Sequence, residues 1–499
     1  MSSEASVSPM PSAAPASSLS SAAPPSFASS EQTTQTTRPA PAEPAGGDRA
    51  PAPRRRTAWA DGLDELRAAA TTEPGRLRVI GAVLALLVLV FGAVAAWEVA
   101  DRAAAADDVV GRSQPLSADA ARIYRSLADA DTTAAGGFLA GGEESRATRD
   151  RYAQDLATAA GLLVKASSGT RGSDRADAQI AALSKALPRY AGLVETARTN
   201  NRQGLPLGGA YLRYANDQMR RELLPAARAL YDAENDRLAA DYAAAKAWPW
   251  LALAAGLLAV GALGWAQRRD YRRTNRVFNR GLLAATAACL AALVWLVAGH
   301  ALARSGLSDS YERGTRSLRV LHEARIDALQ ARGDENLTLV ARGAVLTGDQ
   351  KDFYEAGFRT GMADLVGAGR KGNAAGGSRL GKALALADDE AGRRPVRDAL
   401  RHVRQWQARH AEARAADEKG AYEQALAKVI GGDRPTRESF DRVDAELQRA
   451  LAHEQQEFRS AADGGRAALG GLAAGAAVLA VLGAVGAVLG IGRRLSEYR

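Results

Sequence analysis

The sequence has little of the chemistry that metal centres and covalent catalysis need. Its 499 residues include one cysteine and five histidines. The lone Cys289 has no partner for an intramolecular disulfide, so packing alone must hold the chain together. The histidines lack the i, i+4 spacing that places two ligands on one helix face, and we expect no metal and no other cofactor. They are His300, His322, His402, His410 and His453.

Phosphate-binding and transport signatures are incomplete as well. Residues 376–382 match most of a phosphate-binding loop, but Ala383 stands where the magnesium-binding serine or threonine belongs. No strand is predicted before this loop. The long apolar runs carry no carboxylate or lysine, which argues against an ion-coupled transporter. We therefore expect a protein that is not an enzyme.

Four stretches of the chain are long and free of charge. They are 79–97, 247–266, 281–299 and 467–492, and they contain no Asp, Glu, Lys or Arg. A helix of about 20 such residues crosses the apolar layer of a bilayer. The sequence therefore predicts an all-α membrane protein with four transmembrane helices.

Arginine clusters set the predicted orientation, because short cytoplasmic loops retain positive charge. The loop between the second and third spans carries one acid, Asp270, among its arginines. We interpret the formal net charge of +9 as topology and contact with membrane lipids rather than as nucleic-acid binding. Both termini are predicted to be cytoplasmic, in a multi-pass protein of the cell membrane. The predicted cytoplasmic contact residues are Arg268, Arg269, Arg272, Arg273 and Arg276.

These spans divide the chain into segments. The predicted order is a disordered cytoplasmic tail with a juxtamembrane segment (1–76), span one (77–99), a first extracytoplasmic domain (100–246), span two (247–266), an arginine-rich loop (267–280), span three (281–302), a second extracytoplasmic domain (303–466), span four (467–492) and a short tail (493–499). The juxtamembrane segment is either an amphipathic helix or frayed. A threonine cluster in the long tail is a predicted phosphorylation site; its members are Thr33, Thr34, Thr36 and Thr37.

Each extracytoplasmic domain repeats apolar residues every three or four positions, and glycine-rich or asparagine-rich turns interrupt the repeat. This pattern predicts two four-helix bundles, whose first and last helices continue into the spans as long rods. Pro225 is expected to kink the last helix of the first bundle. Segments 121–131 and 324–334 are alike, which indicates a tandem duplication of span, bundle and span. Chance similarity between two alanine-rich helices is the alternative.

Three groups of residues are candidate sites. The turns farthest from the membrane are predicted to dock a partner: Gly141, Gly142, Glu143, Asn200, Asn201, Arg202, Gln203, Gly348 and Asp349. Polar residues that interrupt the first helix of each bundle either lie on solvated faces, or set register or bind a partner: Asp129, Asp131, Asp334, Glu335 and Asn336. Two GxxxG pairs in the last span predict close packing, within the chain or in a homodimer: Gly471 with Gly475 and Gly486 with Gly490.

Several stretches carry a resemblance to a known family. They are 124–131 with 138–142, 200–206, 334–343 and 439–441. The chain resembles, over about 77–499, the actinobacterial GlnX family of membrane signal transducers. The resemblance implies a link from an extracytoplasmic solute-binding protein, GlnH, to the cytoplasmic Ser/Thr kinase PknG, which relays the availability of acidic amino acids. No ligand-contacting residue can be transferred by motif.

The residues by themselves also favour a transducer, because helices that pass from a bundle into the membrane can carry a small movement inward. No output domain is recognised on the cytoplasmic side, so the output is expected to go to a separate protein. Two alternatives stay open. One is a receptor that binds a small molecule directly between bundle helices, and the other is a cell-envelope scaffold or accessory subunit of a transport complex.

Overall fold

A computed structural model describes residues 73–141, 144–169, 173–274, 279–367 and 375–495. The predicted phosphorylation cluster and juxtamembrane segment lie outside these ranges. The described chain is helical, and its one β-bridge, between Leu346 and Asp352, belongs to no strand. The prediction of an all-α membrane protein is confirmed: four helices are long and apolar enough to cross a membrane. Each of them exposes large apolar side chains that suit contact with lipid, among them Leu86, Leu257, Val294 and Leu489.

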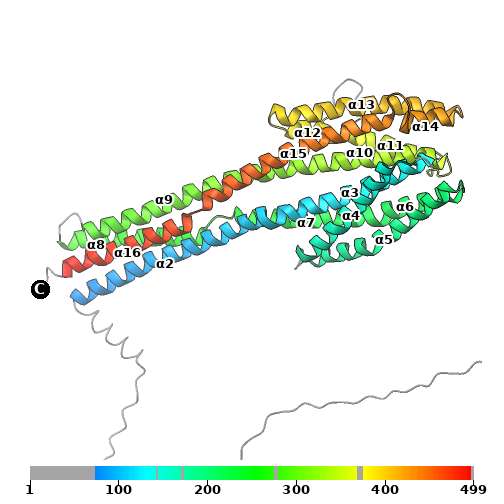
Figure 1. The fold of residues 1–499 in the computed structure, drawn as a ribbon. Coiled ribbons are helices and arrows are strands. Elements are labelled where there is room, and N and C mark those ends of the chain that lie inside the picture. Colours follow the sequence, from blue (N-terminus) through cyan, green and yellow to red (C-terminus); the bar gives the residue numbers. More distant parts are fainter. Residues whose placement is uncertain (1–72, 142–143, 170–172, 275–278, 368–374, 496–499) are drawn as a thin grey trace, which may run out of the picture. The chain divides into compact units, whose positions relative to one another are not determined.

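The colours of Figure 1 follow the helices in chain order. They are α2 (Glu73–Asp108), α3 (Gln114–Leu139), α4 (Arg146–Gly169), α5 (Asp174–Arg202), α6 (Leu207–Gln218), α7 (Leu224–Ala245), α8 (Trp250–Thr274), α9 (Arg280–Asp309), α10 (Arg316–Ala341), α11 (Phe353–Val366), α12 (Arg379–Leu386), α13 (Glu390–Glu418), α14 (Tyr422–Ile430), α15 (Thr436–Leu469) and α16 (Leu472–Leu495). Three π-helical turns join some of them: η1 (Val109–Ser113), η3 (Met219–Leu223) and η4 (Ser310–Thr315).

Two of the four membrane helices continue without a break into the polar part of the molecule. The first runs as α2, η1 and α3, and the third as α9, η4 and α10. The expectation of four continuous rods is wrong for the other two. Between α7 and α8 the chain leaves the helix at Lys246 and passes Pro249, and between α15 and α16 it breaks at Gly470 and Gly471. Gly471 has φ 79°, which suits a residue without a side chain.

Pro225 produces a wide turn rather than a simple kink. Proline lacks a backbone N–H and collides with the preceding helical turn. Here the π-helical turn η3 immediately precedes α7, whose first turn contains Pro225. Pro115 lies in the first turn of α3 directly after η1 in the same way. A π-helical turn leaves room for the ring, so the helix continues past each proline.

The polar part consists of two helical units. In the first unit, which runs from α3 to α7, α3 packs against α4 and α7, while α5 packs against α4, α6 and α7. In the second unit, which runs from α10 to α15, α10 contacts α11, α12 and α15, and α13 packs against α15. The second unit departs from the predicted plan of four helices, because the third predicted helix is divided into α12, α13 and α14, the last after a break at Gly420.

The two units share one hydrophobic core. It includes Ile123 and Leu127 of α3, Tyr190 of α5, and Leu329 and Trp406 of the second unit, all buried. Helices α3 and α10 pack directly against each other. The first helix of each unit, which is also the one continuous with a membrane helix, therefore forms the seam between the units.

The membrane helices pack through small residues. Helix α16 contacts both α2 and α9. A Cβ atom added to Gly281 of α9 would lie 2.3 Å from Gly490 Cα and 2.5 Å from Gly486 O. The second GxxxG pair therefore packs within the chain. The first pair does not form such a face, because Gly471 lies at the break before α16 and an added Cβ there would meet nothing within 4 Å.

Candidate functional site

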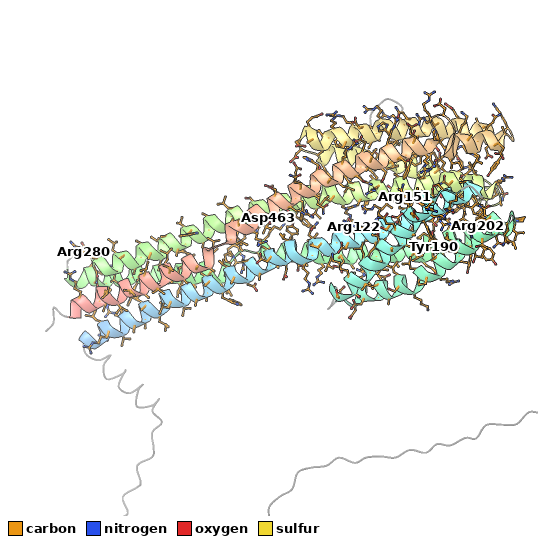
Figure 2. All side chains as sticks on the ribbon, in the orientation of Figure 1. Arg122, Arg151, Tyr190, Arg202, Arg280 and Asp463 are labelled. Carbon is orange, nitrogen blue, oxygen red and sulfur yellow. The ribbon has the colours of Figure 1, made fainter. Side chains whose placement is uncertain are left out.

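Asp131 is buried in the first unit and held by two donors. Its side chain points from α3 into the core and is 8% exposed. The Tyr190 hydroxyl of α5 donates to Oδ1 over 3.1 Å, and Asn216 Nδ2 of α6 donates to Oδ2 over 2.6 Å. Burial raises the pKa of Asp131, against the two hydrogen bonds and the charge of Arg220. Figure 2 places Tyr190 among the side chains of the first unit.

Asp334 occupies the corresponding place on α10 and connects the units. It is 3% exposed. Arg220 of η3, in the first unit, forms an ion pair with it. Gly357 of α11 leaves room for the carboxylate, because an added Cβ would lie 2.4 Å from Asp334 Oδ2. The Arg220 side chain therefore bridges the units beside two buried carboxylates, those of Asp131 and Asp334.

Hydrogen bonds from side chains to backbone oxygens join α3 and α10 at the seam. Thr132 Oγ1 lies 2.9 Å from Leu329 O and can donate to it. Asn336 Nδ2 donates to Thr132 O over 3.3 Å. Gly136 and Gly333 lie beside these bonds, and an added Cβ would be in ordinary contact, 3.4 Å from Asn336 Nδ2 or Thr132 Oγ1, respectively. A relative movement of the two rods must break or exchange these bonds.

Glu335 anchors α10 to the rest of the second unit. Its carboxylate pairs with Arg332 and accepts from Trp406 Nε1 over 3.0 Å. His410 lies between two carboxylates, with Nδ1 2.9 Å from Glu335 Oε1 and Nε2 3.0 Å from Glu355 Oε2. Burial would lower the pKa of His410, but the two carboxylates outweigh it and raise that pKa. The two carboxylates therefore favour the protonated form of His410.

A cavity of about 440 Å³ opens between the units beside this seam. Its walls carry charges of both signs, including Asp129, Arg151, Arg332 and Asp441. Asp129 accepts from Arg151 over 3.0 Å. The Oδ1 atom of Asn336, another lining residue, is buried without a hydrogen-bond donor.

The polar interruptions are thus mostly interior. Asp131, Asp334, Glu335 and Asn336 are buried, so the solvated-face interpretation is wrong for them, whereas Asp129 is half-buried in an ion pair. Their role in signalling stays a prediction. Sequence reasoning missed Trp406, His410 and Glu355, because the partners of a single buried carboxylate lie on helices distant along the chain. The spacing of histidines alone gave no signal for this network.

The docking residues lie at turns. Asn201 Nδ2 donates to Phe138 O over 2.8 Å, so the turn after α5 is fastened to the end of α3. Arg202 and Gln203 are exposed. Asp349 accepts from Thr347 Oγ1 over 2.6 Å. Of the others, Gly141, Asn200 and Gly348 fall in described turns or helix ends, and Gly142 and Glu143 lie outside the described residues. The structure brings the ends of α3 and α10 together, where Leu139 and Leu339 join one small cluster.

The arginine-rich end of α8 is described in part. Arg268, Arg269 and Arg272 belong to α8, and the Arg269 guanidinium lies 5.5 Å from the centre of the Trp265 ring. The Arg273 side chain and the whole of Arg276 fall outside the described part. Trp265 and Arg269 together suit the boundary between lipid and water.

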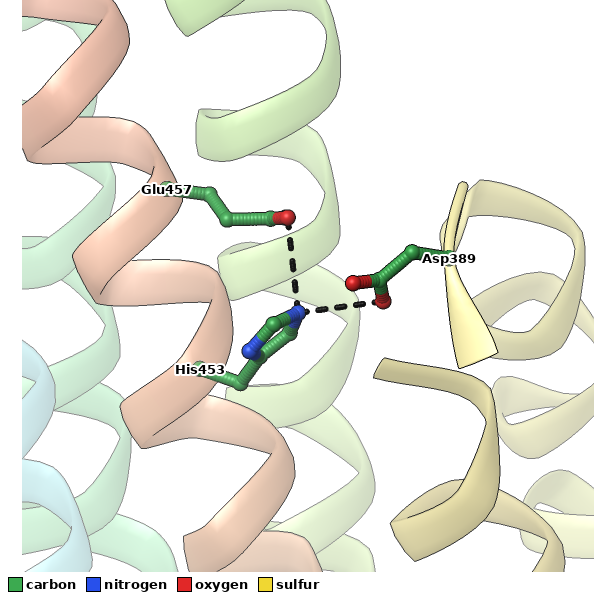
Figure 3. A group of neighbouring side chains, drawn as sticks. All are labelled: Asp389, His453 and Glu457. Carbon is green, nitrogen blue, oxygen red and sulfur yellow. Dashed lines mark hydrogen bonds and ion pairs between the residues drawn. The ribbon is translucent and has the colours of Figure 1, made fainter. Parts of the chain in front are cut away.

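One cluster of metal-ligand types was not predicted. Figure 3 shows His453 Nε2 facing Asp389 Oδ1 at 3.1 Å and Glu457 Oε1 at 3.4 Å. These three residues could supply ligands to a divalent cation. Asp389 also accepts from Gly392 N over 2.7 Å at the start of α13. The signal in the sequence was the i, i+4 pair of His453 and Glu457.

Protonation of Asp334 couples the seam to pH. Burial raises the pKa of Asp334 to about 7, with Arg220 opposing the rise and Asp131 adding to it. A folded pKa above the unfolded value, about 4, contributes stability that is complete below pH ~4 and is lost as pH rises to ~7. We expect Asp334→Asn to flatten the fall of the melting temperature across this window. Melting curves at several pH values would show it.

The matched control is Asp349→Asn. Its hydrogen bonds to Lys351 and Thr347 lower the pKa of Asp349 to about 2, outside the window. The slope should therefore stay that of the wild type. A slope for Asp334→Asn equal to that of the control would contradict the assignment.

Comparison with known proteins finds a family similar to the first unit. Residues 105–243 match the family model of an actinobacterial sensor domain. No curated protein and no solved structure matches the chain. The matched segment begins near the end of α2 and ends near the end of α7, so it covers Asp131, Tyr190, Asn216 and Arg220. The chain is therefore a membrane protein whose first helical unit is similar to the sensor domains of actinobacteria.

Proposed function

We propose that this protein is a non-enzymatic transmembrane sensor and signal transducer. Its helical units lie outside the cell membrane, and both termini lie in the cytoplasm. It relays the availability of acidic amino acids from an extracytoplasmic solute-binding protein to a cytoplasmic Ser/Thr kinase. The match to a sensor domain supports the sensory role, and the resemblance to the GlnX family supports the choice of partners and nutrient.

The observation that carries the proposal is the pair of continuous rods. Helices α3 and α10 contact each other at the buried seam, and each continues through a π-helical turn into a membrane helix. A partner that shifts the packing at the seam therefore acts on two spans directly. Two packings of such a seam need differ by only a few kcal/mol to form a switch. The arginine-rich end of α8 is the proposed contact for the kinase.

The docking of a solute-binding protein can be tested by crosslinking in cells. A photoreactive amino acid at Gln203, which is exposed in the turn after α5, is expected to capture a lipid-anchored solute-binding protein, identified by mass spectrometry. The control position is Asp174, exposed at the opposite end of α5. Capture at both positions, or at neither while the protein is folded, would contradict the proposed docking surface.

A direct receptor for a small molecule is the second candidate. It is favoured by the cavity of about 440 Å³ between the units, whose walls carry both carboxylates and arginines. Such walls suit a zwitterionic ligand, since each sign of charge on the ligand finds its opposite. Calorimetry of the full-length protein with amino acids, in the absence of any solute-binding protein, separates this candidate from the first.

A further inference from the structure

A second cavity, of about 330 Å³, lies among the helices that lead to the membrane. Its walls come from α3, α7, α10 and α15, with Thr315 of η4. These are the four helices that precede or follow the four membrane helices in the chain. A group bound here would therefore touch every helical connection between the polar units and the membrane.

Positively charged side chains predominate in the walls of this cavity. Its titratable cationic residues are Arg122, Arg125, Arg319, Arg325 and His322, and among the described residues neither an aspartate nor a glutamate lines it. Two of these arginines pair with carboxylates that are not themselves part of the cavity walls. Arg325 pairs with Asp444, and Arg319 Nε donates to Glu323 Oε1 over 3.2 Å. Within the described chain, no carboxylate lies within ion-pairing distance of Arg122 or Arg125, both on α3. Figure 2 labels Arg122.

The clustered cations disturb one another. Burial, followed by the charges of Arg325 and Arg122, lowers the pKa of Arg125 to about 10, while the charges of Asp444 and Asp129 oppose the fall. Burial, and then the same three arginines, lower the pKa of His322 to about 3, so its imidazole is neutral. Arg122 is exposed, whereas Arg125 is half-buried and Arg325 is buried. Like charges held close where water is partly excluded cost free energy, which an anion between them would relieve.

Neutral donors complete the walls. Asn235 of α7 accepts a hydrogen bond from Ser117 through Oδ1 over 2.8 Å, which fixes its amide. Its Nδ2 atom is buried and makes no hydrogen bond of normal length, although a weak interaction with the Tyr231 hydroxyl opposes the rise of the Tyr231 pKa. Gln114, Gln448 and Gln455 also line the cavity. Buried N–H groups in native proteins normally have a hydrogen-bond acceptor. An anionic oxygen would supply that acceptor here.

We propose that this cavity binds a small soluble anion that carries carboxylate or phosphate groups. Arg122 and Arg125 supply positive charge that no direct ion pair in the described chain neutralises, and Asn235 Nδ2 supplies a neutral donor. Guanidinium groups bind either oxyanion through two parallel N–H bonds. The volume is at the lower end of the range for small-molecule sites. A lipid headgroup does not fit, because Gln114 follows the predicted end of the first span by 15 residues, about 22 Å along a helix.

The inference goes beyond the transducer function, because it needs neither partner. The test uses the full-length protein in phosphatidylcholine nanodiscs, whose lipid has no net charge. Citrate and inorganic phosphate are titrated by calorimetry at constant ionic strength maintained with sodium chloride. Saturable binding of either is expected, with a rise in melting temperature. Preference for citrate would assign the carboxylate class, and preference for phosphate the phosphate class.

The variant Arg125→Gln separates binding from structure, since its two expected effects have opposite signs. The preferred probe should bind roughly tenfold to a hundredfold more weakly, as for a lost charged hydrogen bond. Without the anion, the variant should melt at the same temperature as the wild type or higher, because one of the mutually repelling charges is gone. Arg175→Gln, at an exposed pair with Asp236 (3.8 Å) away from the cavity walls, should match the wild type in both measurements.

The proposal is overturned if neither probe binds the wild type saturably, or if Arg125→Gln binds it with unchanged affinity. Capture of a solute-binding protein at Gln203 does not depend on either result. The two proposals can therefore fail separately.

Discussion

Replacing Glu335 with glutamine is expected to destabilise the protein by about 3–5 kcal/mol, the usual cost of removing one partner from a buried ion pair. The change keeps the shape of the side chain and removes its charge. Glu335 is 1% exposed and accepts from Trp406 and His410 in addition to its pair with Arg332. The variant leaves the buried Arg332 guanidinium without a compensating charge. Its remaining acceptors, Thr436 Oγ1 and Val429 O, are neutral.

Urea unfolding followed by tryptophan fluorescence measures this effect, because Trp406 is itself bonded to Glu335. The matched control is Glu412→Gln, which removes an exposed pair with Lys428 Nζ at 2.9 Å. Pairs at the surface are screened by water, and no measurable change is expected. If both variants unfold at the same urea concentration, the network does not stabilise the second unit.

Replacing Gly281 with leucine is expected to disrupt the packing of the membrane helices. Helix α9 approaches α16 so closely that even a methyl group would lie 2.3 Å from Gly490 Cα, well below the distance at which carbon atoms attract. Forcing larger side chains into packed sites costs about 1–3 kcal/mol, and more where backbone atoms are in the way. Asn279 Nδ2, which donates to Gly490 O over 2.9 Å, would lose its acceptor as the helices separate.

The same substitution at Gly264 of α8 is the control, because an added Cβ there meets nothing within 4 Å. Thermal unfolding of both variants in detergent, followed by circular dichroism, should show a lowered midpoint for Gly281→Leu alone. Equal midpoints would mean that α9 and α16 do not pack through these glycines.

The spans were predictable from the sequence because the absence of charge over about 20 residues is a strong local signal. The same signal concealed two breaks. Pro249 and the pair Gly470 and Gly471 are ordinary turn signals, but they lie at the edges of apolar runs that were assigned to single rods. Membrane length and helix continuity are separate properties, and apolar composition indicates only the first.

The seam could be predicted only in part. Asp131 and Asp334 were recognised as unusual, since both interrupt apolar helices. Which of two interpretations held depended on partners from distant helices, such as Tyr190 and Arg220, 59 and 114 residues away in sequence from the carboxylates they contact. Helical periodicity places a residue on a face of its own helix and says nothing about the helix opposite. The arginine-lined cavity of about 330 Å³ was missed for the same reason. Each of its helices contributes only a few residues, of types that are common on protein surfaces.

The π-helical turns allow a membrane helix to rotate about its own axis. An α-helix advances about 100° per residue, and a π-helical turn holds more residues per turn. If Val109–Ser113 relaxed into α-helical geometry, the whole of α2 would turn about its own axis relative to the seam. Gly92 of α2, where an added Cβ would lie 2.1 Å from Ala480 Cβ of α16, would then present a different face to that helix. A signal could thus cross the bilayer as a twist of one helix about its own axis.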